Sequence, residues 1–124
     1  MSTRILQLGL GAVFMVLGGW CVVAPGSVMA LCFRPAFQSA APVVPMLVGG
    51  FGAQAMIAGL FALTARFTRT TFAAYAVGLL PFLALDGWFF FVTRALSPLG
   101  AGADLAGNLI MLGICWTGWR WAAN

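Results

Sequence analysis

Four long apolar segments dominate the pattern of hydrophobic and polar positions along this chain. They cover residues 5–24, 43–65, 71–92 and 101–119, and each is 19 to 23 residues long. A helix rises about 1.5 Å per residue, so about 20 mostly apolar residues cross the hydrocarbon core of a bilayer. The pattern therefore predicts an all-α fold, an integral membrane four-helix bundle in which residues 1–124 form a single transmembrane domain.

The linkers predict how these helices follow one another. Residues 66–70 and 93–100 are short, so each reverses the chain and makes the flanking helices antiparallel neighbours. The linker before residue 43 is longer, and its apolar run 27–33 lies between Pro25-Gly26 and Arg34-Pro35. These boundaries favour a short interfacial helix on the membrane surface. It either caps the bundle or covers a binding site as a lid.

Small residues recur at spacings that allow membrane helices to approach closely. Pairs four residues apart are Gly49–Ala53, Ala55–Gly59, Gly102–Ala106 and Ala103–Gly107, and Gly11 and Gly18 are seven apart. Close backbone approach replaces the hydrophobic driving force that is missing in lipid. These faces either pack the bundle internally or associate with another membrane protein or with a second copy of the chain.

Composition and charge place the chain in a membrane and suggest its orientation. Hydrophobic residues make up 63% of the sequence and charged residues 6%, and the mean hydropathy is +1.05. In a four-span protein Arg4, Arg66, Arg69 and Arg120 fall on one side, and Arg34 and Arg94 on the other. The positive-inside bias predicts that both termini are cytoplasmic in a bacterial-type inner (plasma) membrane.

Two further expectations follow from the same features. The first apolar segment is longer than a signal-peptide core and is followed by Pro25, so we expect it to remain in the mature protein. Most of the arginines lie just beyond helix ends, where they can meet lipid phosphates, and they form no basic face that could track a nucleic acid. Membrane lipids are expected partners and nucleic acid is not.

Missing residue types limit the chemistry that the chain can carry. It contains no His, Glu or Lys, which excludes histidine-ligated haem and zinc, a Ser-His-Asp triad and Schiff-base catalysis. We therefore predict no catalytic residue, no metal and no cofactor. Cys21 and Cys32 lie near the same side of the membrane and can pair if that side is oxidising, whereas Cys115 lies near the other. The alternative is that all three thiols act as small hydrophobes.

A few polar residues inside the spans are the candidate site. Asp86 lies about six residues, roughly 9 Å, from the outer end of the third span, and an acid within the membrane is a functional candidate. Asn108 lies at nearly the same depth in the fourth span, so the two side chains can meet. One interpretation is an interhelical clamp between Asp86 and Asn108.

The other interpretation is a ligand-binding or proton-handling pocket that opens outward. Asp86 would be its acid, Asn108 and Gln54 its hydrogen-bonding partners, and Arg94 or Asp104 would lie at the rim. Pro81 removes a helical hydrogen bond nearby and can kink the third span.

Two classes of function remain open. The shortage of reactive groups favours a noncatalytic accessory or assembly subunit of a larger membrane complex or homo-oligomer. The alternative is a small transporter or lipophilic-ligand binder that uses Asp86, Asn108 and Gln54. An enzyme is less favoured, because an Asp with amide partners has no second catalytic group.

Overall fold

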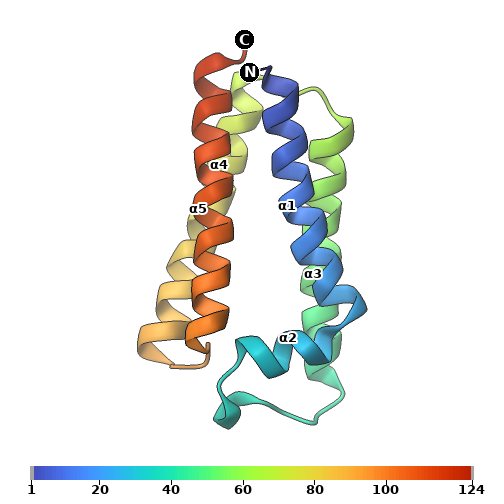
Figure 1. Cartoon of the computed structure of the whole chain (residues 1–124), viewed down its shortest axis with the longest axis vertical. Helices are drawn as coiled ribbons and strands as arrows, with labels where there is room; N and C mark the ends of the chain where they lie inside the picture. The colour runs from blue at the N-terminus through green and yellow to red at the C-terminus, as the bar shows by residue number, and fades with distance from the viewer. Residues whose placement is uncertain (1, 124) are drawn as a thin grey trace.

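The computed structural model describes residues 2–123 and confirms the all-α four-helix bundle (Figure 1). The four long helices are α1 (Thr3–Val23), α3 (Val43–Thr64), α4 (Arg69–Gly87) and α5 (Pro98–Trp121), and α4 continues into the π-helical segment η2 (Trp88–Val92). The linker between α1 and α3 holds the short helix α2 (Pro25–Cys32) and the 3-10 turn η1 (Pro35–Phe37). Four helices, with η2 counted as part of the α4 span, are long and apolar enough to cross a membrane.

The four spans form two antiparallel pairs. Helix α1 packs along α3, α4 packs along α5, and α1 also contacts α5 (Figure 1). The chain begins and ends at the same end of the bundle, which we call the termini end. The opposite end carries α2, and we call it the α2 end.

Glycines bring α1 and α3 into close contact. A Cβ atom added to Gly18 would lie 2.6 Å from the carbonyl oxygen of Gly52, and one added to Gly59 would lie 3.0 Å from that of Gly11. The structure thus confirms that Gly11, Gly18 and Gly59 pack the bundle internally. Gly52 has the same role, although the four-residue spacings did not single it out.

Of the two uses predicted for Gly102 and Ala106, internal packing is not found. A Cβ atom at Gly102 would meet nothing within 4 Å, and both residues are exposed. Helix α5 instead turns Gly107 toward α1, where a Cβ atom would lie 3.2 Å from a methyl group of Leu17. The spacing alone did not reveal which side of α5 faces its neighbours.

Helices α3 and α4 are antiparallel, as the short linker predicts, but they are not closely packed neighbours. They meet through side chains: the rings of Phe51 and Phe82 have centroids 5.9 Å apart, and the Tyr75 hydroxyl donates to the carbonyl of Ala58 at 2.8 Å. The small-residue face of α3 is already occupied by α1, which leaves bulkier side chains toward α4.

Polar side chains tie the helices together at the termini end. Gln7 is buried, and its amide nitrogen donates to the carbonyl oxygen of Ala62 at 2.6 Å while its oxygen accepts from the backbone N–H of Phe67 at 3.4 Å. Arg4 donates to the carbonyl oxygen of Leu63 at 2.8 Å. These bonds satisfy carbonyl groups at the end of α3 that have no partner within the helix.

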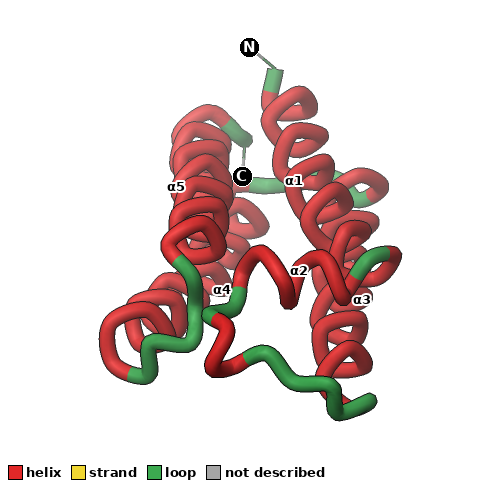
Figure 2. Tube along the Cα trace, turned by 60° about the horizontal axis from the view of Figure 1, so that its bottom comes forward, coloured by secondary structure: helices red, strands yellow, loops and turns green. Residues whose placement is uncertain are grey.

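At the α2 end, helix α2 lies across the space between the two helix pairs (Figure 2). The backbone N–H of Ser97 donates to the carbonyl of Cys32 at 2.8 Å, and its hydroxyl donates to that of Leu31 at 2.6 Å. A Cβ atom on Gly100 would lie 2.5 Å from the same Cys32 oxygen. The predicted short helix therefore exists, and its last turn is docked on the start of α5.

The end of the third span differs from the regular helix that the sequence suggests. After Gly87 the chain widens into η2, in which the backbone N–H of Thr93 donates to the carbonyl of Trp88 at 3.1 Å, five residues back. Arg94 follows with a φ of 55°, a left-handed conformation that costs a residue with a side chain about 1–2 kcal/mol. The π-turn places Phe90 under the guanidinium of Arg34, 5.4 Å from the ring centre.

Candidate functional site

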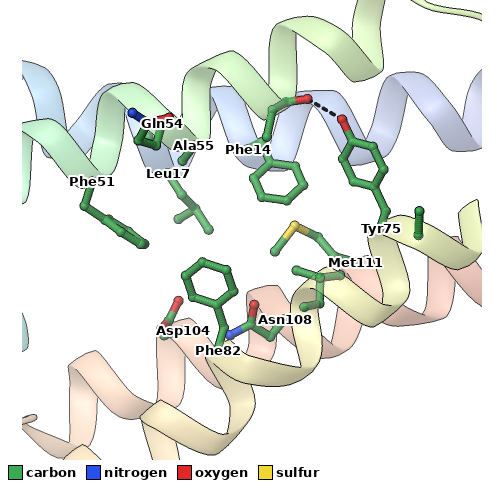
Figure 3. A pocket seen from close by; sticks show the side chains of 15 residues that line it. Phe14, Leu17, Phe51, Gln54, Ala55, Tyr75, Phe82, Asp104, Asn108 and Met111 are labelled. Atoms are coloured by element: carbon green, nitrogen blue, oxygen red, sulfur yellow. Dashed lines mark hydrogen bonds between the residues drawn. The ribbon is translucent and has the colours of Figure 1, made fainter. Parts of the chain in front are cut away.

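A cavity of about 410 Å³ lies between the two helix pairs (Figure 3). Its lining is mostly apolar and comes from all four long helices. The largest of these side chains are Phe14, Leu17, Phe51, Tyr75, Phe82 and Met111.

The polar part of the lining is concentrated on α5. Asp104 and Asn108 are four residues apart, so they share one helical face, and both point into the cavity (Figure 3). Asn108 is only 3% exposed, and its amide nitrogen donates to a carboxylate oxygen of Asp86 at 2.9 Å. The carboxyl group of Asp104 lies close enough to that of Asp86 for the two to interact. The two acids and the amide therefore form one cluster between α4 and α5, which we call the acid–amide cluster.

The structure brings Asp86 and Asn108 together, as the depth argument predicts, and adds Asp104 to them. Asp86 itself does not belong to the cavity wall but lies behind Asp104 and Asn108. Gln54 lines the opposite wall on α3. Arg94 is exposed in the loop before α5 and does not line the cavity.

The cavity opens sideways, in contrast to the outward opening that the sequence suggests. Its exposed lining residues, among them Phe51, Gly78 and Phe82, all belong to α3 and α4. On the opposite side, Leu17 of α1 contacts α5 and the lining residues are half-buried or buried. In a bilayer the opening between α3 and α4 would face lipid tails.

Tyr75 is a site residue that sequence reasoning missed. Its hydroxyl bond to Ala58 crosses the cavity from α4 to α3 (Figure 3), and its ring packs edge-on against Phe14 with centroids 6.0 Å apart. The available signal was that this is the only tyrosine in the chain. A phenol inside an apolar span needs a hydrogen-bonding partner, and a backbone carbonyl supplies it here.

The cysteines offer no further site. Cys21, Cys32 and Cys115 are all free thiols in the structure, so Cys21 and Cys32 are not bridged. Burial, with a smaller contribution from Asp104, raises the pKa of the Cys32 thiol above its ordinary value. Within residues 2–123 no group of three or more acidic or thiol side chains is placed to hold a metal ion.

The fold and the cavity define a class: a small membrane protein of four spans with a sideways-open apolar cavity and an acid–amide cluster in its wall. Comparisons with protein-family models, curated proteins and solved structures find no match to the chain.

Proposed function

We propose that this protein binds a lipophilic small molecule that enters its cavity from the bilayer. The cavity itself carries the proposal. A volume of about 410 Å³, a mostly apolar lining and a few converging polar groups are the properties of small-molecule sites. The polar groups are Asp104, Asn108 and Gln54.

Ligand binding explains two features that a purely structural clamp does not require: the second acid and the unfilled space between the helix pairs. A clamp requires only the bond between Asp86 and Asn108, whereas a second acid within the span adds a desolvation cost that the clamp does not need. Packing alone would fill the space between the helix pairs, because a void loses contacts on every side that lines it. A cavity with an acid in its wall is better suited to an occupant.

An accessory subunit is the second candidate, and one observation favours it. Helix α5 exposes Gly102, Ala106 and Gly113, and a Cβ atom at either glycine would meet nothing within 4 Å. Such a face allows close approach of a further helix. Purification in a mild detergent followed by mass spectrometry tests this role, and recovery of the chain without another subunit or a second copy would count against it.

The proposed setting is a bacterial-type inner (plasma) membrane with both termini in the cytoplasm. Four of the six arginines belong to the side that carries the termini, which agrees with the positive-inside bias. A hollow at the termini end includes Arg4 and Arg66. Its charge suits the phosphate of a lipid headgroup.

Photolabelling in lipid vesicles tests the cavity. The probe is a small apolar aryl diazirine, which partitions into the bilayer and reacts with its neighbours on illumination. Met111 lines the cavity and is 4% exposed, whereas Met46 is 73% exposed on the outer surface of α3. We expect labelling of both the Met111 and Met46 peptides in the native protein.

Two leucine substitutions form a matched pair for this experiment. Gly78 and Gly113 are both exposed helical glycines whose added Cβ would meet nothing within 4 Å, but only Gly78 lines the cavity. Gly78→Leu should remove labelling at Met111 and keep it at Met46, and Gly113→Leu should change neither. A native protein that is labelled at Met46 and not at Met111 would refute ligand entry.

A further inference from the structure

The cavity wall presents acceptor oxygens and no cation. Asp104 is the only charged residue in the lining within residues 2–123. Two of the donors in the lining have partners: the Asn108 amide nitrogen donates to Asp86, and the Tyr75 hydroxyl donates to Ala58. The amide of Gln54 lies on the opposite wall. Arg34, in the linker after α2, donates to the carbonyl of Leu96 at 2.8 Å.

From this arrangement we infer that the occupant is a lipophilic amine, whose nitrogen binds at Asp104 and Asn108 with Asp86 behind them. The inference rests on the proposed ligand-binding function and adds the chemical class of the ligand. An amine supplies the positive charge that the wall lacks and an N–H donor beside Asp104, and its apolar body fits the rest of the cavity.

Asn108 gives independent support for a ligand at this position. Its side chain is 97% buried, as its exposure of 3% shows, and its nitrogen is committed to Asp86. Its carbonyl oxygen points toward the cavity (Figure 3), where a donor on an occupant can reach it. Within residues 2–123 no buried side-chain nitrogen or oxygen lacks a hydrogen-bonding partner, so this oxygen is an acceptor that faces the cavity and not an orphaned buried group.

The two acids also explain how an amine reaches this site through the lipid. Asp104 and Asp86 each lie about six residues, roughly 9 Å, from the α2 end of their spans. A carboxylate within lipid that has a second acid beside it is costly, so Asp104 is better accommodated with its proton until a cation replaces it. The other titratable groups near it are the thiols of Cys21 on α1 and Cys32 on α2, which are weaker acids.

A neutral amine crosses the hydrocarbon more easily than its charged form. On reaching Asp104 it takes the proton of that side chain: the O–H bond of the Asp104 carboxyl group breaks and an N–H bond forms on the amine. The product is an ammonium ion beside a carboxylate, and the total charge of protein and ligand is unchanged. The ion pair then accepts further stabilisation from the Asn108 oxygen.

The test compares two probes that differ in one atom. One is tritiated phenylbutyl dimethylamine, and the other is the hydrocarbon of the same shape in which a C–H group replaces the nitrogen. Binding is measured as saturable retention by vesicles that contain the protein, after subtraction of empty vesicles. The native protein should bind the amine at least tenfold more tightly than the hydrocarbon.

Asp104→Asn keeps the volume of the side chain and removes the acid. We expect it to weaken amine binding at least tenfold and to change hydrocarbon binding less than twofold, while thermal unfolding in detergent shows that the variant is folded. If it does not fold, Asp104→Ser serves instead, with the same expected result, because it also removes the acid from the cavity wall.

The outcomes separate this inference from the proposed function. Three results would refute an amine as the ligand and would not refute the cavity site. They are equal binding of the two probes, absence of saturable amine binding, and unchanged amine binding in the folded Asp104 variant. Retention of both probes by Gly78→Leu at native affinity would overturn the cavity site, and the amine with it.

Discussion

Two glutamines within the spans have opposite surroundings. Gln7 is 3% exposed and bonded to the carbonyl of Ala62 and the backbone N–H of Phe67. Gln54 is exposed on the cavity wall and has no hydrogen bond to another residue of the described range 2–123. The same residue type thus acts as a structural tie at one position and as a free polar group at the other.

Replacing each glutamine by leucine is therefore a matched test. Gln7→Leu should lower the free energy of unfolding by about 1–3 kcal/mol, because it strips buried backbone groups of their partner. Gln54→Leu should change it by less than about 0.5 kcal/mol. The measurement is reversible unfolding of both variants in detergent, and equal losses would contradict the assignment of Gln7 as the tie.

Cys32 supplies a pH-dependent prediction. Its thiol is free and half-buried, and burial raises its pKa above the ordinary 9.0. Because the thiolate is the reactive form, maleimide labelling should proceed without reductant, be slow at neutral pH, and rise about tenfold per pH unit until the pH passes the raised pKa. Ser39→Cys combined with Cys32→Ser is the exposed control, and its rate should level off at a lower pH. Labelling of Cys32 that needs reductant would indicate a bridge instead.

At the scale of single residues, depth along a helix is what the sequence predicts well. Counting residues from the helix ends placed Asp86 and Asn108 at similar depths, and they meet. The direction that a side chain takes around the helix axis is harder to predict, because it depends on how each helix is rotated against its neighbours. This is why Asp104 was expected at the rim and Arg94 near the site, while Asp104 lies in the wall and Arg94 lies outside the cavity.

At the scale of helices, the apolar segments predicted all four spans to within a few residues, since length and hydropathy decide them. The π-helical end of the third span was not predicted, because hydropathy does not distinguish a π-helical turn from an α-helical one. Small-residue spacing identified the packing face of α1 correctly, whereas on α5 it also selected Gly102 and Ala106, which do not pack inside the bundle. Small residues four apart permit close approach of two helices, but the position of the neighbouring helix decides which of these faces is used.

Adjacent glycines of α1 test this packing. A Cβ atom on Gly18 would lie 2.6 Å from the Gly52 oxygen and 3.0 Å from the Cβ of Ala55, whereas Gly19 has nothing within 4 Å. Gly18→Ala should therefore force α1 away from α3 and cost about 1–3 kcal/mol, and Gly19→Ala should cost nothing. Thermal unfolding in detergent gives the comparison. A stable Gly18→Ala variant would mean that the two helices are not in backbone contact.

At the scale of the whole molecule, the sequence did not predict how the four spans group. Short linkers suggested that α3 and α4 pack together, but a short linker fixes only the distance between helix ends. The close contact of α1 with α3 is set by the glycines on both helices. The cavity results from this grouping of the helices, because the pairs α1–α3 and α4–α5 touch mainly through larger side chains.

The orientation of the whole chain is tested with reporters. A reporter that is active only outside the cytoplasm should give signal when fused after Gln38, in the linker that follows α2, and none when fused after Asn124. The physical reason is the excess of arginine at the termini end and the positive-inside bias. Signal from the fusion at the end of the chain would reverse the assignment.

The contact between the last turn of α2 and the start of α5 affects the order in which the helices assemble. The Ser97 hydroxyl and its acceptor, the carbonyl of Leu31, are separated by 66 residues. During synthesis α2 leaves the ribosome well before Ser97 exists, so the first three spans must enter the membrane while the last turn of α2 has no partner. The final helix then completes the bundle. In a nascent chain released before α5 is made, the last turn of α2 would have no partner, and a membrane-protein quality-control system could recognise it.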